Sequence, residues 1–475
     1  MQEQRSTPMR CGKSYVRIRR GGRVSIAAAV VVAIGLAAAS IAVTPTLGGP
    51  SVAEVRLALS ANCKTLLETC GCASDKTGGF PEKAALLDQY RREGAPLVVL
   101  DAGDAVDTTD LPEKAEVMIR AMGAAGYGAL NIGDQEAGRG LSFLKHIETL
   151  TPMAIVSSNL VVAATGELVA KPFVIVDAGG AKIGVLGVVS AVGTPSLSGS
   201  PPAGSGTTSA NAPRVADEPL AVRNPEEAIK RYLPQVRKQA DAVVVLAHVS
   251  PAQSKELARI PGVDVVVGGD QRSDVPDPEL VSGTLWIQPP SYGRFLGVVR
   301  LALDGERLRP SQWRIAKVPW KGPRQPEVAK IIEAYTTKES AAMVELMNRT
   351  TTQHEGYAGV EKCAQCHADI AESWKKTRHA NGWETLKRAG HRYDPECLPC
   401  HTTGDPRKLP SVALKGVQCE DCHLPMNQHG QYDSGARHEK DVDWKAVCVR
   451  CHDGQRSPGF DFAKSLPLVT HQNPQ

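Results

Sequence analysis

The chain has 475 residues, of which 42% are hydrophobic and 22% charged, a composition that indicates globular domains and excludes a disordered or fibrous protein. The formal net charge is +4, yet residues 1–24 alone hold seven basic residues and one acidic residue, so the rest of the chain has no basic excess. Aromatic residues make up 4%, too few for base-stacking platforms, and we therefore expect no nucleic-acid partner.

The first segment of the chain is typical of an export signal. Basic residues precede an uncharged apolar run at 25–43, which approaches the ~20 residues that span a bilayer. Two interpretations stay open: residues 1–48 form a signal peptide that is cleaved, or residues 25–43 remain as a membrane anchor. Either interpretation predicts a periplasm-facing protein, with membrane contact only through the uncleaved segment.

Residues 50–350 alternate short apolar runs with helical stretches, which predicts an α/β domain. The runs are rich in Val, Ile and Leu and are about five residues long, as buried strands are. We expect strands at 55–59, 96–100, 153–156, 173–176, 183–189, 242–246, 263–267, 285–287 and 295–303. We expect helices at 81–93, 111–125, 225–239 and 326–347. The segment 192–219 is rich in Gly, Pro, Ser and Thr, which predicts a flexible insertion.

The composition changes near residue 352. Ten of the twelve histidines lie from position 354 onward, together with four Cys-x-x-Cys-His motifs. The motifs are Cys363, Cys366 and His367; Cys397, Cys400 and His401; Cys419, Cys422 and His423; and Cys448, Cys451 and His452. This spacing lets two thiols bind the two vinyl groups of one haem and places an imidazole beneath the iron. Zinc sites would not require a histidine after every cysteine pair, so we predict four covalently attached c-type haems.

Six further histidines are candidates for the distal side of these haems. They are His354, His379, His391, His429, His438 and His471. The region resembles the cytochrome c554/c552-type multihaem family in the segments at 359–386, 396–404 and 416–429. The resemblance implies a mainly helical or irregular tetrahaem cytochrome c domain at 352–475, with closely packed haems and with His379 and His429 as distal iron ligands. His354 and His391 are weaker candidates.

Residues 50–350 resemble the 5′-nucleotidase/metallophosphoesterase family. The resemblance rests on LDAGD (100–104), YGALNIGDQE (127–136), KIGVLGVVS (182–190), VVVLAHVSP (243–251) and VDVVVGGDQ (263–271). It implies a metallophosphoesterase-like α/β sandwich in which Asp, His and Asn at the strand ends hold two metals that activate a water and clamp a phosphate.

The metal motifs of that family are broken in this sequence. Ser60 and Asn62 replace an Asp-x-His pair, and Gln135 replaces a histidine. A His-x-His pair is replaced by residues 270–272. The residues that remain as a weak remnant site are Asp104, Asp134 and His248. We therefore expect no dinuclear metal centre.

Three cysteines follow the first predicted strand, at the expected mouth of the site. They are Cys63, Cys70 and Cys72, and they resemble the Cys-Gly-Cys signature of an exported branch of nucleotidase-like proteins. One interpretation is a thiol redox or sulfur-compound site, in which neighbouring Lys64 lowers a thiol pKa. The other is one structural disulfide and one spare thiol.

These features predict an exported tetrahaem cytochrome that exchanges electrons with redox partner proteins, with the α/β domain as a docking or substrate module. A first alternative is an oxidoreductase that acts on a small sulfur or thiol substrate through Cys63, Cys70 and Cys72 and passes the electrons to the haems. A second alternative is a metal-dependent phosphoesterase with an atypical site.

Overall fold

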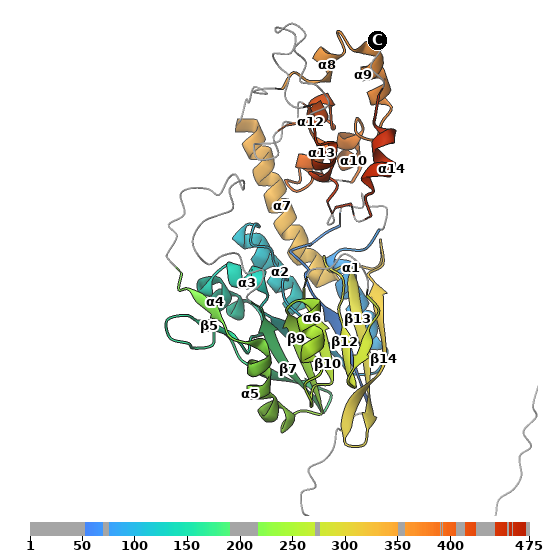
Figure 1. Ribbon diagram of the computed structural model, residues 1–475. Coiled ribbons are helices and arrows are strands. Elements are labelled where there is room, and N and C mark those ends of the chain that lie inside the picture. Colours follow the sequence, from blue (N-terminus) through green and yellow to red (C-terminus); the bar gives the residue numbers. More distant parts are fainter. Residues whose placement is uncertain are drawn as a thin grey trace, which may run out of the picture. The chain divides into compact units, whose positions relative to one another are not determined.

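The computed structural model of the chain describes residues 53–69, 76–190, 217–270, 276–349, 357–389, 391, 393–404, 414–423, 442–453, 456–457 and 459–471 (Figure 1). They belong to one compact unit, Gly48–Gln475. The expectations for 25–43, for most of 192–219 and for Cys70, Cys72, His354 and His429 lie outside these residues. Within the described ranges, every helix is too short or too polar to cross a membrane.

Two six-stranded sheets form the α/β region (Figure 1). The first has the order β14-β13-β1-β2-β3-β4, the second has the order β11-β12-β10-β9-β7-β6, and β5 pairs with β8 separately. The strands of the first sheet are β1 (Glu54–Ser60), β2 (Leu97–Asp101), β3 (Ala129–Asn131), β4 (Ala154–Val156), β13 (Phe295–Asp304) and β14 (Arg307–Lys317). The other strands are β5 (Leu160–Val162), β6 (Phe173–Ala178), β7 (Ala181–Val189), β8 (Leu220–Val222), β9 (Ala242–His248), β10 (Val265–Gly268), β11 (Glu279–Val281) and β12 (Thr284–Ile287).

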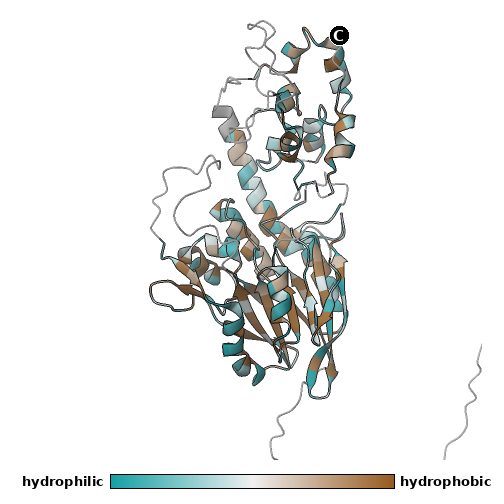
Figure 2. Cartoon of the chain, in the orientation of Figure 1, coloured by the Kyte–Doolittle hydropathy of each residue, from teal (hydrophilic) through white to brown (hydrophobic). Residues whose placement is uncertain are grey.

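The central strands are buried on both faces because each sheet lies between the other sheet and a layer of helices. In β1, Leu57 and Leu59 pack between the sheets, whereas Ala58 packs with the helices. In β9, Leu246 packs between the sheets and Val245 on the outer side. Successive side chains of a strand point to opposite faces, so an unbroken Val/Leu/Ile run fills two core layers at once. Figure 2 shows these strands as mostly hydrophobic.

Seven helices are described in the α/β region. They are α1 (Phe80–Arg92), α2 (Pro112–Ala124), α3 (Asp134–Gly138), α4 (Leu141–Leu150), α5 (Pro225–Arg237), α6 (Pro251–Leu257) and α7 (Pro326–Arg349). Leu87 of α1, Met118 of α2 and Ile332 of α7 belong to the core outside the first sheet. Ile229 of α5 and Leu257 of α6 belong to the core outside the second sheet. The predicted α/β sandwich is confirmed.

The predicted strands and helices match observed elements, but the short elements β3, β5, β8, β11, α3, α4 and α6 were not predicted. Neither was the long strand β14. This strand forms a hairpin with β13 and lies at the edge of its sheet. Its sequence mixes charged residues with a proline, Pro310, opposite a register shift between Arg300 and Leu301. Edge strands tolerate proline and charge because one side of the ladder faces solvent, and this hides them from a search for apolar runs.

The C-terminal region consists mostly of short helices. They are α8 (Val360–Cys363), α9 (Ala368–Lys375), α10 (Gly382–Ala389), α11 (Leu398–His401), α12 (Cys419–His423), α13 (Trp444–Val449), α14 (Phe462–Ser465) and the 3₁₀ helix η3 (Leu466–Leu468). Among its described residues the buried apolar cluster consists of Trp383, Leu386 and Leu398. This part of the chain therefore has little hydrocarbon core of its own.

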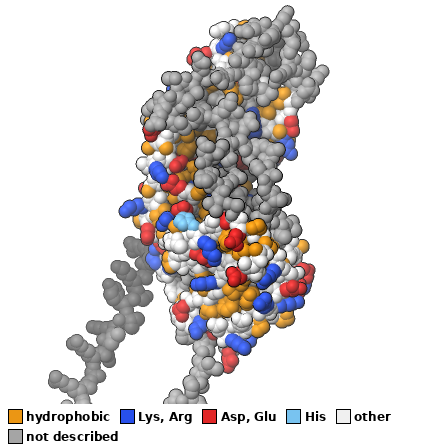
Figure 3. Space-filling view, turned by 90° about the vertical axis from the view of Figure 1, so that its left-hand side faces the viewer, with side chains coloured by type: hydrophobic (Ala, Val, Ile, Leu, Met, Phe, Trp, Pro, Cys, Tyr) orange, Lys and Arg blue, Asp and Glu red, His pale blue; other side chains and the backbone are white. Residues whose placement is uncertain are grey.

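Charges of both signs are interspersed on the surface. Figure 3 shows Lys and Arg side chains alternating with Asp and Glu over the described part of one face. Neither sign gathers into a single large patch on the visible coloured atoms of that face.

Candidate functional site

Each Cys-x-x-Cys-His motif includes a helical turn. In the first motif, the N–H of His367 donates to the Cys363 carbonyl oxygen at 2.9 Å, and in the fourth the N–H of His452 donates to the Cys448 carbonyl oxygen at 3.0 Å. The second and third motifs lie at α11 and α12. Residues three and four apart on a helix share one face, so the two thiols and the imidazole project to the same side. This arrangement suits one haem held by two thioethers and one axial imidazole.

Two motif histidines have their Nδ1 atoms fixed by neighbouring groups. The Nδ1–H of His401 donates to the carbonyl oxygen of Gly382 at 2.8 Å, and Nδ1 of His452 lies 3.0 Å from Oγ of Ser457. A histidine whose Nδ1 is held in this way presents Nε2 to a metal in the required tautomer. Both residues therefore fit axial ligation of a haem iron.

A histidine outside the motifs faces one of these proximal histidines. The ring centroids of His379 and His452 are 6.2 Å apart. A metal about 2 Å from one nitrogen of each of two imidazoles separates their ring centroids by roughly 6 Å. Burial lowers the pKa of both imidazoles, which favours the neutral form that binds metals. His379 and His452 are thus spaced as two axial ligands of one iron.

A cavity of about 580 Å³ opens beside His452. Val449, Phe460 and Phe462 contribute apolar side chains to its lining, Lys445 contributes a positive charge, and Asp453 and Asp461 contribute negative charges. The Phe460 ring stacks on the His452 ring, with centroids 4.6 Å apart and planes 12° from parallel. A cavity of this size with apolar side chains next to an imidazole fits a planar macrocycle.

Thiols of different motifs also lie next to each other. The thiol of Cys419 lies close enough to raise the pKa of Cys363, and the thiol of Cys400 lies close enough to raise the pKa of Cys451. The first motif is therefore close to the third, and the second is close to the fourth.

The α/β region carries a second cluster of polar residues at the carboxyl ends of its strands. Asp104 follows β2, Asp134 begins α3 directly after β3, and His248 is the last residue of β9. Nε2 of His248 lies 2.8 Å from Oδ1 of Asp134 and 3.4 Å from Oδ1 of Asp104. The ammonium of Lys64 lies 4.0 Å from Oδ2, the other carboxylate oxygen of Asp104. The strand ends of α/β sheets are where such folds bind ligands.

Asp104 is held in a strained conformation by a buried carboxylate. Its φ is +57°, in the left-handed region that non-glycine residues rarely adopt. Glu136, which is fully buried, accepts the N–H groups of Asp104, Val106 and Gly133 at 2.9, 3.0 and 2.9 Å. Residues held in strained backbone conformations cluster at functional sites, where the surrounding structure fixes them.

The charges of the cluster are strongly coupled. Burial disfavours a charged imidazole, but the carboxylates of Asp104 and Asp134 outweigh burial and raise the pKa of His248 to about 9. Burial raises the pKa of Asp104 well above its usual range, although His248 opposes the shift. Burial also opposes ionisation of Asp134, yet its hydrogen bonds with His248 and Asp104 lower its pKa to about 2. The cluster thus favours bound positive charge, which a proton on His248, a proton on Asp104 or a cation supplies.

Comparisons with known proteins match the two regions separately. The family model described as "Cytochrome c554 and c-prime" matches residues 362–424. Cytochrome c-554 of Nitrosomonas europaea is 31% identical over 131 residues, which cover 23% of this chain and 51% of that protein.

The α/β region matches nucleotidases. A 2′,3′-cyclic-nucleotide 2′-phosphodiesterase/3′-nucleotidase of Yersinia enterocolitica is 23% identical over 369 residues, covering 68% of this chain and 53% of that protein. The crystal structure of a 5′-nucleotidase precursor from Thermus thermophilus superimposes with a TM-score of 0.50 at 20% identity, covering 61% of this chain and 60% of the other. The chain joins a 5′-nucleotidase/metallophosphoesterase-like domain to a cytochrome c554 region. It spans about half the length of the curated relatives it matches.

The cytochrome c554 region implies covalent c-type haems and suggests electron transfer, and its residues fit that group as described above. The nucleotidase-like domain fits its family's metals less well. Ser60 donates its hydroxyl to Asp101 at 2.6 Å, and the side-chain amide of Asn62 donates to the Gly269 carbonyl oxygen. Oδ1 of Asn62 is buried without a hydrogen-bond partner among the described residues. The groups present fit one cation at Asp104, Asp134 and His248 better than two.

Cys63 is a poor candidate for a reactive thiol. It is 1% exposed, and Nζ of buried Lys83 lies 3.2 Å from its sulfur. Burial raises the pKa of the Cys63 thiol to about 12, although the Lys83 ammonium opposes the shift. At this thiol burial dominates over the Lys83 ammonium, and the ammonium of Lys64 lies beside Asp104. Cys70 and Cys72 lie outside the described residues, so their role stays a prediction.

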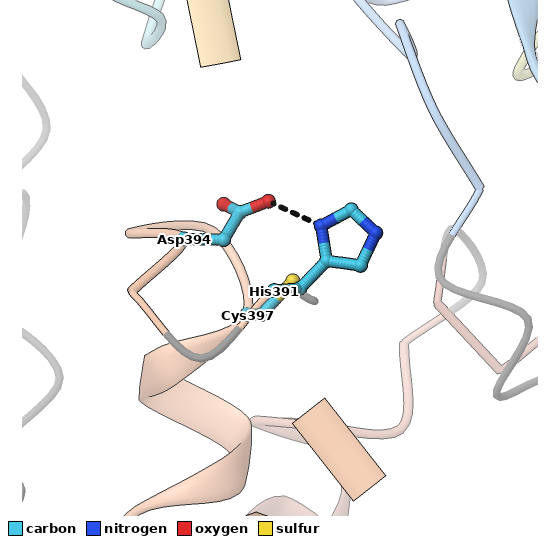
Figure 4. A group of neighbouring side chains, drawn as sticks. All are labelled: His391, Asp394 and Cys397. Atoms are coloured by element: carbon cyan, nitrogen blue, oxygen red, sulfur yellow. Dashed lines mark ion pairs between the residues drawn. The ribbon is translucent and has the colours of Figure 1, made fainter. Parts of the chain in front are cut away.

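His391 lies in a small cluster with Asp394 and Cys397 (Figure 4). Its Nδ1 is 3.4 Å from Oδ2 of Asp394, whose hydrogen bond raises the pKa of the imidazole. The cluster has the composition of a metal site, but Cys397 belongs to a haem-attachment motif. Figure 4 shows the second ring nitrogen of His391 pointing away from the carboxylate, as an oriented axial ligand requires.

The sequence did not single out three residues that shape these sites. Lys83 fills the position beside Cys63, Glu136 holds the Asp104 loop, and His471 lies beside His423 with ring centroids 5.7 Å apart. A single sequence does not show whether a lysine or a glutamate is buried. His471 belonged to the pool of non-motif histidines but had no motif to distinguish it.

Proposed function

We propose that the protein is an exported, periplasm-facing cytochrome with four covalently attached c-type haems that carries electrons between redox partner proteins. The observation that carries the proposal is the recurrence of Cys-x-x-Cys-His on four turns of one region. The haem groups supply the reversible one-electron chemistry when bound. The residues of the chain supply thioether attachment, axial imidazoles and close packing.

The spacing of His379 and His452 supports electron transfer over catalysis at that haem. An iron with two strong axial ligands has no open position for a substrate, so it exchanges electrons only. The apolar side chains in the lining of the cavity beside His452 suit a macrocycle.

The nucleotidase-like domain serves in this proposal as a docking or substrate module that has lost dinuclear hydrolase activity. The replacements at Ser60 and Asn62 support the loss. Membrane attachment through residues 25–43, if that segment stays uncleaved, would keep the haems close to membrane-bound redox partners.

A redox titration of the full chain matured with haem tests the function. We expect a haemochrome assay to count four haems per chain, and optical spectra to show reversible reduction. We expect EPR signals dominated by low-spin ferric haem. A haem-free protein, or one whose haems cannot be reduced and reoxidised, would contradict the proposal.

A second candidate function rests on the cluster at the strand ends. Ligand atoms of Asp104, Asp134 and His248 lie within 4.8 Å of one another, and this set suits a single divalent cation such as Mn²⁺. A cation there would give the domain an atypical, single-metal phosphoesterase site. The ammonium of Lys64 supplies a further positive charge next to Asp104.

Metal analysis after incubation with Mn²⁺ and removal of the excess tests this candidate. We expect one equivalent of bound Mn²⁺ per chain in the native protein, and none in His248→Ala. His146→Ala is the matched control, because His146 lies on α4 in an ion pair with Glu116, away from the cluster. Equal Mn²⁺ in the native protein and His248→Ala, or none in either, would remove the candidate.

A further inference from the structure

We propose that His471 is the distal axial ligand of the haem attached at Cys419 and Cys422, on the opposite side of the iron from His423. The inference rests on the proposed function, because it assigns one of the axial ligands of the tetrahaem region. The observation behind it is that two imidazoles lie side by side although the spacing of the histidines in the sequence does not predict this. Forty-seven intervening residues separate the two histidines, and they include the whole fourth motif.

The local fold fixes the end of the chain just before His471. Asp461 caps α14 by accepting the N–H of Lys464 at 3.1 Å, and the 3₁₀ helix η3 follows directly. The carbonyl oxygen of Leu466 then accepts the N–H groups of Val469 and Thr470, both at 3.1 Å. It also accepts the hydroxyl of Thr470 at 2.7 Å. Three hydrogen bonds to one carbonyl turn the chain and set the direction of the next side chain.

The rings of His423 and His471 are arranged like the rings of an axial pair. Their centroids are 5.7 Å apart and their planes are inclined by 42°. This separation is close to the roughly 6 Å expected when one metal lies between two imidazole nitrogens. It is also close to the 6.2 Å between His379 and His452. The edge of the Trp444 ring contacts His423 at 5.6 Å between centroids and limits how far that imidazole can turn.

The Nδ1 atom of His471 is buried and forms no hydrogen bond with the described residues. Buried polar atoms are normally satisfied, so an unsatisfied ring nitrogen beside a proximal histidine points to a ligand. By contrast, Nδ1 of His391 faces Asp394, and the ring of His379 faces His452.

The surface next to His471 is unusually apolar. Leu468 is 79% exposed and Val469 is 40% exposed, although both lie within three residues of His471, whose Nδ1 is buried. Clusters of exposed apolar side chains mark surfaces that another group covers. A porphyrin bound between His423 and His471 is an apolar group of the right kind, and its edge would shield these side chains from water.

The experiment compares the full chain, matured with haem, with its His471→Ala and His471→Met variants. We expect mass spectrometry to find four haems in all three proteins, since His471 takes no part in thioether formation. In His471→Ala we expect one haem per chain to change from low-spin to high-spin by EPR. The reduced variant should bind one more equivalent of carbon monoxide than the native protein.

Added imidazole should return that haem to the low-spin state, because it replaces the missing ring. His471→Met should keep the haem low-spin and raise the midpoint potential of one haem, as thioether ligation does. His146→Ala, a surface histidine of the nucleotidase-like domain, is the matched control and should behave like the native protein.

The outcomes separate the two claims. Unchanged spin states and unchanged carbon monoxide binding in His471→Ala, with four haems attached, overturn the His471 assignment and leave the cytochrome function intact. The distal ligand would then be sought among His354, His391, His429 and His438. Fewer than four haems in the native protein would overturn the proposed function itself. If His471→Ala fails to mature, the spin state and potential of His471→Met decide the assignment.

Discussion

The two regions of the molecule differ in what fills their interiors. In the nucleotidase-like domain, three large clusters of Val, Leu, Ile and Ala lie between and outside two sheets. In the cytochrome c554 region, the described buried cluster consists of Trp383, Leu386 and Leu398. The first region therefore folds around its own hydrocarbons. The second needs covalently bound cofactors to supply the missing apolar mass, so attachment and folding should be coupled there.

The largest expected effect comes from withholding haem. A chain produced without haem attachment should keep the sandwich and lose ordered structure in the cytochrome region. We expect hydrogen exchange to show protected amides in strands such as β9 and β7, and nearly complete exchange from 357 onward. The haem-loaded chain is the control. Equal protection of the cytochrome region with and without haem would show that this region does not depend on its cofactors.

A core truncation should sharpen the same contrast. Leu246 is fully buried between the two sheets, and its replacement by alanine should lower the free energy of unfolding of the sandwich by ~2–5 kcal/mol. Leu398→Ala removes the same atoms from a fully buried position in the small cluster of the cytochrome region. In the haem-loaded chain we expect a smaller cost there, because covalent attachment still holds the neighbouring chain.

Urea unfolding checks both variants, with far-UV circular dichroism for the sandwich and haem absorbance for the cytochrome region. A larger loss for Leu398→Ala than for Leu246→Ala would contradict the view that haem, and not side-chain packing, stabilises the C-terminal region.

A smaller effect concerns the rate at which the Cys63 thiol is alkylated, and it leaves the fold intact. The folded pKa of Cys63 is raised from 9.0 to about 12, so at pH 8 the folded thiol is protonated. The thiolate fraction is then about a thousandfold lower than in the unfolded chain, and alkylation by iodoacetamide should slow by at least that factor. The same shift lowers stability as pH rises above 9, because the unfolded thiol then releases its proton and the folded one does not.

Peptide mapping of alkylated native and urea-unfolded protein measures the Cys63 rate, with Cys63→Ser to confirm the assignment. Rapid labelling of Cys63 in the native state would restore it as a candidate for thiol chemistry.

The sandwich could be predicted because buried strands have apolar sequences. The runs at 242–246 and 183–189, for example, match β9 and β7. The sequence also predicted that Asp104, Asp134 and His248 would approach one another. That prediction came from the resemblance to metallophosphoesterases, since Asp104 and Asp134 follow neighbouring parallel strands of the first sheet, whereas His248 ends a strand of the second.

Other features needed the three-dimensional structure. Lys83 lies on α1, where lysines usually face solvent, yet it is buried against Cys63. The strand β14 has the polar sequence of an edge. In the cytochrome region, short helices and long connections leave the relative placement of the histidines open, so the pairing of His471 with His423 had no sequence signal.

The most direct test of the account is the intact mass of the chain purified after haem maturation, measured under denaturing conditions. Thioether bonds survive denaturation, so the account predicts a single species heavier than the polypeptide by four haems. Loss of both cysteines of one motif, Cys448→Ala with Cys451→Ala, should remove one haem and leave three. A native mass equal to that of the polypeptide alone, or one unaffected by the double replacement, would contradict the claim that haems build the C-terminal region.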